Sequence, residues 1–181
     1  MVNAANALTV LRLVMVPFFV VFLANGGTRG RIVAFALFAV ASVTDLLDGR
    51  LARQRGLVTD FGKIADPVAD KALTGSALIT LSALGQLSWW VTAVILAREL
   101  GITALRMAVI RRNVIAASRG GKLKTLLQVI AISLYVLPGP FGVARPVVMG
   151  VALVVTVVTG ADYVLRARGR SGPPGPGTGA P

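Results

Sequence analysis

Long hydrophobic stretches recur along the chain at intervals of about twenty-five to thirty residues, and short polar segments separate them. About twenty apolar residues in a helix cross the ~30 Å hydrocarbon layer of a membrane. In lipid the backbone must satisfy its hydrogen bonds within each segment, which favours helices over strands. The pattern predicts six membrane-spanning helices, near residues 8–24, 32–51, 64–84, 89–110, 123–137 and 146–165.

The composition supports this fold class. The chain has 181 residues, of which 55% are hydrophobic and 14% charged, and its mean hydropathy is +0.78. Soluble domains of this size rarely have such values. We therefore expect an all-α integral membrane protein in which residues 1–168 form one six-helix domain. Residues 169–181 are rich in Gly and Pro and have no apolar face to bury, so they are expected to form a disordered tail.

The basic residues indicate an orientation. They concentrate after the second and fourth predicted helices and near the C-terminus, whereas the opposite connections contain only Arg29, Arg31 and Arg145. By the positive-inside rule, both termini and the active site of this multi-pass cell membrane protein are expected to be cytoplasmic. Topology and contact with anionic membrane lipids explain the net charge of +12, so no nucleic-acid partner is expected.

The acidic residues are unusually clustered, because five of the seven lie between positions 45 and 70. The chain has no Cys and no His, which excludes thiolate and imidazole ligands. Asp45 and Asp48 are three residues apart and Asp66 and Asp70 are four apart, so each pair lies on one face of its helix. A short connection lets the two helices run antiparallel, which would bring the four carboxylates together.

Four neighbouring carboxylates require cations among them, because like charges in a partly buried site repel one another. Oxygen ligands suit Mg²⁺ or Mn²⁺, and a pair of such ions is a known arrangement for displacement at phosphorus. Helix capping explains Asp60 but not Asp45, which lies inside an apolar run. Arg53 adds a guanidinium fork that suits a phosphate.

The full pattern resembles a known signature. Asp45-x2-Asp48-Gly49-x2-Ala52-Arg53-x8-Gly62-x3-Asp66-x3-Asp70 matches, at every fixed position, the signature of the CDP-alcohol phosphotransferases, which are membrane enzymes of phospholipid synthesis. Four further stretches resemble the phosphatidylglycerophosphate synthase branch of that family: NAANALTVLR, DPVADK, ARELGITALR and GKLKTLLQ. The resemblance covers residues 3–165.

The resemblance implies a reaction and a set of site residues. The enzyme would transfer a phosphatidyl group from CDP-diacylglycerol to glycerol 3-phosphate, giving phosphatidylglycerophosphate and CMP, and would form a homodimer. Asp45, Asp48, Asp66 and Asp70 would hold two divalent ions, and Asp70 would also activate the acceptor hydroxyl as the base. The residues implied to line the CDP-diacylglycerol site are Thr44, Gly49, Ala52, Arg53 and Gly62.

A phosphorylated acceptor requires further cations. The candidates are Arg98, Arg106, Lys122 and Lys124. The two arginines share one face of the fourth predicted helix, and the two lysines lie near the N-terminus of the fifth, where anions are favoured. The sequence fits equally well a structural role for Arg98 and Glu99, each paired with another helix, and a topological role for the lysines.

Other functions stay open at this point. Within the family, phosphatidylglycerol as acceptor would make the chain a cardiolipin synthase, and inositol phosphate would make it a phosphatidylinositol phosphate synthase. Basic residues favour a phosphorylated acceptor, and only resemblance favours glycerol 3-phosphate. An ion-conducting transporter is a remote alternative, but its acids would be spread across the membrane or between repeated halves, whereas these cluster on one side.

Overall fold

The computed structural model describes residues 4–55, 60–110 and 119–169, and the side chains of residues 8–44, 68–69, 71–105 and 123–165. Within these ranges it contains α-helices and no strand, which confirms the predicted all-helical architecture. The six helices are α1 Ala4–Asn25, α2 Gly27–Arg55, α3 Asp60–Ala83, α4 Trp89–Ile110, α5 Arg119–Val136 and α6 Ala144–Gly169.

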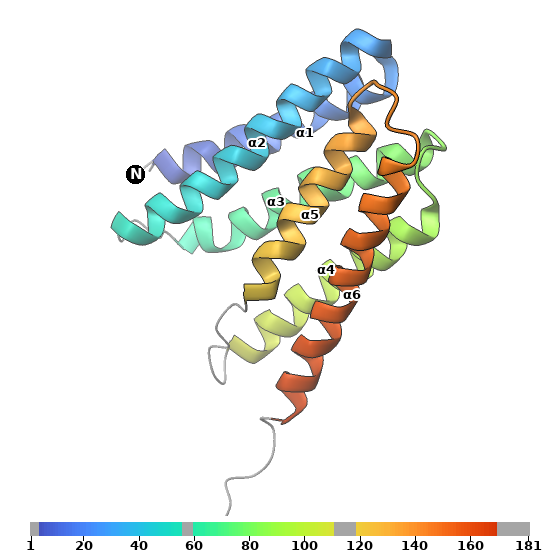
Figure 1. Cartoon of the computed structure of the whole chain (residues 1–181). Helices are drawn as coiled ribbons and strands as arrows, with labels where there is room; N and C mark the ends of the chain where they lie inside the picture. Colours follow the sequence, from blue (N-terminus) through green and yellow to red (C-terminus); the bar gives the residue numbers. More distant parts are fainter. Residues whose placement is uncertain (1–3, 56–59, 111–118, 170–181) are drawn as a thin grey trace, which may run out of the picture.

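The helices are arranged as antiparallel neighbours (Figure 1). Short connections join α1 to α2, α3 to α4, and α5 to α6, and all three lie at one end of the molecule, at the upper right of Figure 1. Away from this end, the group α1 to α3 diverges from the group α4 to α6. We call the end with the three connections the closed end and the other the open end.

Glycine permits the tightest of these connections, between α1 and α2. A Cβ atom on Gly26 would lie 2.3 Å from the Cα atom of Gly30 and 2.6 Å from the carbonyl oxygen of Phe22. Gly27 has a φ of 53°, in the left-handed region that side chains disfavour. The close antiparallel packing of α1 and α2 therefore depends on Gly26 and Gly27.

The apolar core lies towards the closed end. Its buried side chains come from the C-terminal halves of α1, α3 and α5, from the N-terminal halves of α2, α4 and α6, and, with Leu87, from the connection between α3 and α4. Phe19 and Phe38, both fully buried, pack with their ring centroids 5.7 Å apart and join α1 to α2. Ser82 and Thr92 share a buried hydrogen bond of 2.7 Å between α3 and α4, of the kind that stabilises helix pairs in lipid.

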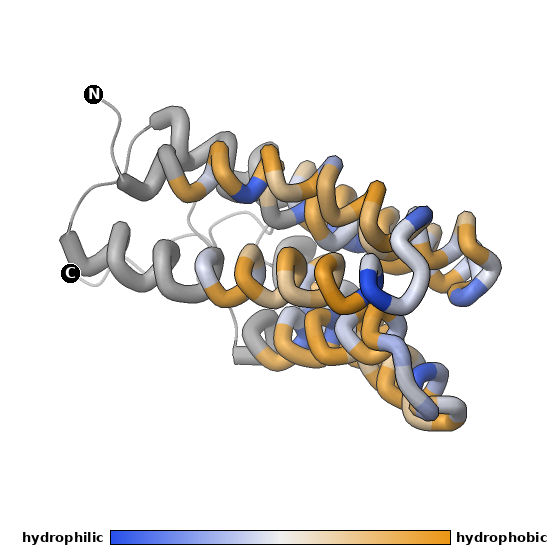
Figure 2. Tube along the Cα trace, turned by 90° about the horizontal axis from the view of Figure 1, so that it is seen from above, coloured by the Kyte–Doolittle hydropathy of each residue, from blue (hydrophilic) through white to orange (hydrophobic). Residues whose placement is uncertain are grey.

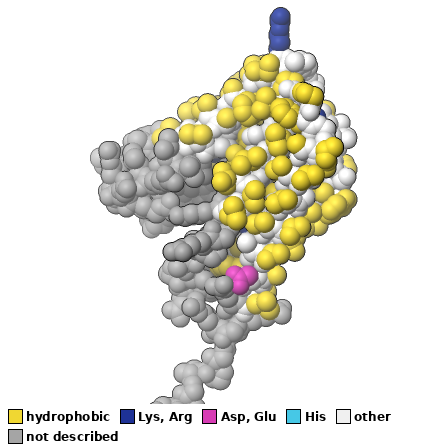
Figure 3. All heavy atoms as spheres, viewed as in Figure 1, with side chains coloured by type: hydrophobic (Ala, Val, Ile, Leu, Met, Phe, Trp, Pro, Cys, Tyr) yellow, Lys and Arg dark blue, Asp and Glu magenta, His cyan; other side chains and the backbone are white. Residues whose placement is uncertain are grey.

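The outward surface is also apolar. Hydrophobic residues extend along the described lengths of the helices (Figure 2), and hydrophobic side chains cover much of the described surface in Figure 3. On α6 the exposed residues Val147, Val151, Val154 and Val158 follow helical spacing and form one outward stripe. Such continuous apolar surface suits lipid rather than water, so the chain is a membrane protein.

Three helices meet the length and hydropathy expected of a membrane span within the described residues. These spans are Leu8–Asn25, Gly27–Thr44 and Ala144–Leu165, and α5 contains a shorter apolar stretch, Leu123–Val136. The helices α3 and α4 contain ionisable residues, including Lys71, Arg98 and Glu99, which interrupt their apolar runs. The membrane character is thus supported, whereas the number of six spans stays a prediction.

Two arginines cap the C-terminus of α5 at the closed end. Arg31 of α2 donates to the carbonyls of Tyr135 and Val136, the latter at 3.0 Å, and to Gln86 Oε1 at 2.7 Å. Arg145 donates to the carbonyls of residues 134 and 137, at 2.9 and 2.7 Å. The last carbonyls of a helix have no partner within the helix, and cations near them are favourable. The two arginines therefore satisfy four consecutive carbonyl groups.

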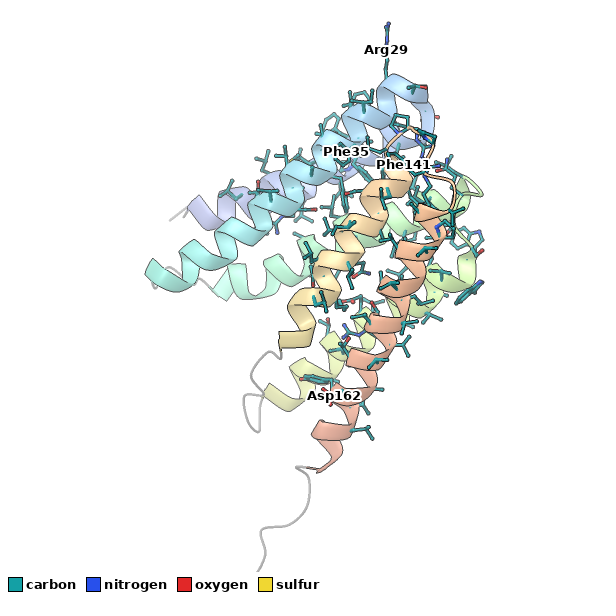
Figure 4. All side chains as sticks on the ribbon, viewed as in Figure 1. Arg29, Phe35, Phe141 and Asp162 are labelled. Carbon is teal, nitrogen blue, oxygen red and sulfur yellow. The ribbon has the colours of Figure 1, made fainter. Side chains whose placement is uncertain are left out.

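Replacing Arg31 with Met is expected to lower the stability of the purified protein. The change removes three hydrogen bonds from a charged donor and leaves part of the α5 terminus unsatisfied, at a cost of about 2 kcal/mol. Thermal unfolding in detergent, followed by circular dichroism, measures the effect. Arg29→Met is the matched control, because Arg29 is exposed and points away from the bundle at the same end (Figure 4). Equal melting of the two variants would contradict the capping role.

Candidate active site

The predicted acidic residues lie in two consecutive helices towards the open end. Asp45 and Asp48 belong to α2, and Asp66 and Asp70 belong to α3, as the sequence predicted. Their side chains lie outside the described ones, as do those of Gly49, Ala52, Arg53 and Gly62, so their convergence stays a prediction. The side chain of Thr44, the remaining predicted CDP contact, is described and is partly buried.

A cluster of ion pairs centred on Glu99 lies between α3, α4 and α5. Its carboxylate is 3.1 Å from Lys71 Nζ of α3 and 3.2 Å from the neighbouring Arg98 Nη1, and it also pairs with Lys124 Nζ of α5. The side chains of these four residues are only 8–22% exposed. One carboxylate thus holds together cations from three helices.

Arg98 also connects α4 to α6. Its Nε atom donates to the carbonyl of Thr156 at 3.1 Å, and Nη2 donates to Thr159 Oγ1 at 3.1 Å. A Cβ atom on Gly160 would lie 3.0 Å from Arg98 Cγ and 3.1 Å from Nε, so the absence of a side chain there accommodates the arginine. This guanidinium is held by α6 and Glu99 together.

A small cavity adjoins this cluster. Its volume is about 60 Å³, and it lies between α3, α4 and α5. Its polar lining residues are Lys71, Thr74, Glu99, Lys124, Thr125 and Gln128. The side chain of Gln128 is 4% exposed, and its Nε2 atom has no hydrogen-bond partner among the described residues. The cavity is therefore cationic and contains an unused donor.

The predicted acceptor residues have different outcomes. Arg98 and Lys124 are brought together through Glu99, whereas the side chains of Arg106 and Lys122 lie outside the described ones. Arg98 and Glu99 each pair with another helix, as the structural alternative expected, and the two also contact each other. Phosphate binding by Arg98 and Lys124 stays a prediction, as it does for Arg106 and Lys122.

Sequence reasoning assigned no role to Lys71 or Gln128. Two signals could have drawn attention to them. Lys71 directly follows Asp70, the predicted base, and Gln128 is four residues after Lys124, which places both on one face of α5. Both residues stand in stretches that carry the family resemblance, DPVADK and GKLKTLLQ.

Comparison with known proteins supports the family assignment that the aspartate signature indicated. The family model described as CDP-alcohol phosphatidyltransferase matches residues 2–158, which extend from α1 into α6 and include both acidic pairs. A Mycobacterium tuberculosis H37Rv protein named probable phosphatidylglycerophosphate synthase is 60% identical over 170 residues, covering 91% of this chain and 81% of the relative.

Two less similar relatives come from other bacteria. A Bacillus subtilis protein is 35% identical over 181 residues, covering 90% of this chain and 94% of its own length. An Escherichia coli K12 protein is 41% identical over 137 residues, covering 72% of this chain and 75% of the relative. Both are named CDP-diacylglycerol–glycerol-3-phosphate 3-phosphatidyltransferase.

Proposed function

The chain belongs to the CDP-alcohol phosphatidyltransferase family, and we propose that it transfers the phosphatidyl group of CDP-diacylglycerol to glycerol 3-phosphate. Its products are phosphatidylglycerophosphate and CMP. The observation that carries this proposal is the family match over residues 2–158, together with relatives named for this activity that align with about nine-tenths of the chain. The open end of the helix bundle is the proposed location of the chemistry.

The four aspartates provide ligands of the right kind for the metal ions. Asp45 and Asp48 on α2, and Asp66 and Asp70 on α3, offer carboxylate oxygens only, which suits Mg²⁺ or Mn²⁺. Two bound ions would stabilise negative charge on the phosphate groups. The helical spacing of each acidic pair supports this assignment, because both members lie on the same face.

Asp70 is proposed to act as the base. The primary hydroxyl of glycerol 3-phosphate gives its proton to the Asp70 carboxylate, and its oxygen bonds to the phosphorus on the diacylglycerol side. The bond from that phosphorus to the CMP oxygen breaks, and CMP leaves with the electron pair. The chain contains no His or Cys, so a carboxylate is the most available base. Thr44, Gly49, Ala52, Arg53 and Gly62 are proposed to contact CDP-diacylglycerol.

The proposed membrane arrangement places both termini and the open end in the cytoplasm, where CDP-diacylglycerol headgroups and glycerol 3-phosphate would meet. The excess of Lys and Arg in the sequence near the helix termini of the open end supports this orientation. The full arrangement would have six spans, and the enzyme would act as a homodimer.

An acceptor assay tests the proposal. Detergent-solubilised enzyme is incubated with Mg²⁺, CDP-diacylglycerol and one labelled acceptor at a time: glycerol 3-phosphate, inositol phosphate or phosphatidylglycerol. We expect CMP release and labelled lipid with glycerol 3-phosphate alone, and we expect loss of both after chelation of the metal. Incorporation of inositol phosphate but not glycerol 3-phosphate would overturn the choice of acceptor. Ion flux in vesicles without CMP release would favour a transporter.

A further inference from the structure

The closed end of the bundle has an unbalanced positive charge. Arg29 and Arg31 lie in the first two turns of α2, and Arg145 is the second residue of α6. Every Asp and Glu of the sequence lies in the open-end half of its helix, apart from Glu99 at the middle of α4. The helices therefore bring three guanidinium groups to the closed end and no acidic side chain with which they could pair.

Two of these arginines are held in fixed positions. Arg31 uses Nε and Nη2 for the carbonyls of Val136 and Tyr135 and for Gln86, and Arg145 uses Nε and Nη2 for the carbonyls of residues 134 and 137. The four carbonyls are consecutive, so both guanidinium groups lie around about one helical turn. A helix C-terminus carries about half a negative charge, and two arginines exceed it.

Each of the two guanidinium groups keeps one nitrogen for a further partner. Nη1 of Arg31 and Nη1 of Arg145 make no hydrogen bond within the described part of the chain, and neither atom is buried. A guanidinium donates its strongest hydrogen bonds to carboxylates and phosphates. The two free nitrogens therefore favour an oxyanion at the surface of the closed end.

The surroundings of the two arginines are typical of a membrane surface. Trp89 and Trp90 begin α4 at the same end and are exposed, as is Val143 in the connection before α6. Exposed Trp residues at a helix end mark the level of the lipid headgroups. Phe141 also lies at this end (Figure 4), and the guanidinium of Arg145 is 5.8 Å from the centre of its ring. An oxyanion bound here therefore belongs to a phospholipid rather than to the aqueous phase.

The charge of the closed end narrows the class of lipid. Every phospholipid has a phosphodiester, but a zwitterionic headgroup also brings a cation close to the three arginines. An anionic headgroup adds no such cation. Each basic residue near a membrane surface favours anionic lipid about fivefold, so the closed end selects an anionic phospholipid.

We infer that Arg31 and Arg145 bind the phosphodiester of an anionic phospholipid in the headgroup layer at the closed end. Nη1 of each arginine donates to the phosphate, while the bonds of Nε and Nη2 to α5 hold the two groups in place. This lipid is neither substrate nor product, because the proposed phosphatidyl transfer takes place at the open end. The inference goes beyond that reaction and depends on no step of it.

The two tryptophans allow a local measurement, because they are the only Trp residues of the chain. Trp89 is three positions after Gln86, which accepts from Arg31. Full-length protein is reconstituted in phosphatidylcholine vesicles that contain a small fraction of lipid brominated near the headgroup, either phosphatidylglycerol or phosphatidylcholine. Bromine quenches Trp fluorescence at close range. We expect brominated phosphatidylglycerol to quench at least about twofold more strongly than brominated phosphatidylcholine.

Substitutions test which arginines are responsible. Arg145→Met and Arg31→Met should each lower quenching by phosphatidylglycerol towards that by phosphatidylcholine. Arg29→Met is the matched control, because it removes the same charge from the same end, but Arg29 points away from the bundle (Figure 4) and should leave most of the preference. Thermal melting and size-exclusion chromatography establish that each variant is folded. The comparison of the two lipids on the wild type needs no variant.

Three results would overturn the site. Equal quenching of the wild type by the two lipids would show that the closed end has no preference for anionic lipid. Equal loss of the preference in Arg29→Met and Arg145→Met would show diffuse attraction by charge instead of a built site. Loss of the preference in inorganic phosphate, but not in chloride of equal ionic strength, would assign the site to a soluble anion. CMP release is measured separately, so failure of this site and failure of the proposed function are distinguishable.

Discussion

Replacing Asp70 with Asn is expected to abolish turnover while leaving CDP-diacylglycerol binding largely intact. The amide cannot accept the proton of the acceptor hydroxyl, and loss of a positioned base alone lowers kcat by about a hundred- to ten-thousandfold. A single change among four carboxylates weakens metal and donor binding less than it removes the base. The measurements are CMP release under saturating substrates and equilibrium binding of labelled CDP-diacylglycerol.

Asp60→Asn is the matched control for this change. Asp60 is the first residue of α3 and lies in the same acidic segment, but the sequence indicates a capping role for it. Asn caps helices about as well as Asp, so this variant should keep near wild-type turnover. Substantial residual activity in Asp70→Asn would refute the assignment of the base. Loss of donor binding together with turnover would indicate that Asp70 serves mainly to hold metal.

Replacing Glu99 with Gln is expected to destabilise the folded enzyme severely. The change removes the carboxylate that pairs with Lys71, Arg98 and Lys124, and it leaves three poorly hydrated cations close together. Breaking a buried ion pair on one side costs about 3–5 kcal/mol, and the 8–22% exposure of these side chains favours the lower part of that range. Thermal unfolding in detergent should show a midpoint several degrees below that of the wild type.

A double variant distinguishes charge imbalance from simple loss of contacts. Adding Lys124→Met to Glu99→Gln removes the most buried of the three cations, and it should recover part of the lost stability. A double variant less stable than the single one would show that packing, rather than uncompensated charge, dominates. If Glu99→Gln unfolded at the same temperature as the wild type, solvent would be screening the repulsion among the three cations.

The sequence predicted the helices better than their ends. The apolar run over residues 89–110 predicted both boundaries of α4. The helix begins at Trp89, where the run itself begins, so α4 has no polar first turn that a hydropathy pattern would miss. For α5 the predicted start at residue 123 is four residues later than the observed Arg119. Polar residues at a helix terminus do not register in a hydropathy pattern, although Gly and Lys can complete a first turn there.

The long-range pairing of charged residues could not be predicted in the same way. The sequence placed Glu99 inside a helix and indicated partners on other helices, but it did not identify them. Lys71 lies 28 positions before Glu99 and Lys124 lies 25 after it, and these contacts depend on how three helices pack. Gln128 was missed for the same reason, since only the packing of the described helices shows that its Nε2 atom is buried without a hydrogen-bond partner among them.

The two arginines at the C-terminus of α5 imply an order of assembly. Arg145 is eight to eleven positions from the carbonyls it binds, so this interaction can form as soon as α5 and α6 close into a hairpin. Arg31 reaches its carbonyls across 104 and 105 positions and can do so only after the N-terminal hairpin docks. Helices in lipid insert before they associate. The C-terminus of α5 therefore gains its bonds to Arg145 in an early local step, when α5 and α6 pair, and its bonds to Arg31 in a later step, when the N-terminal helices pack against them.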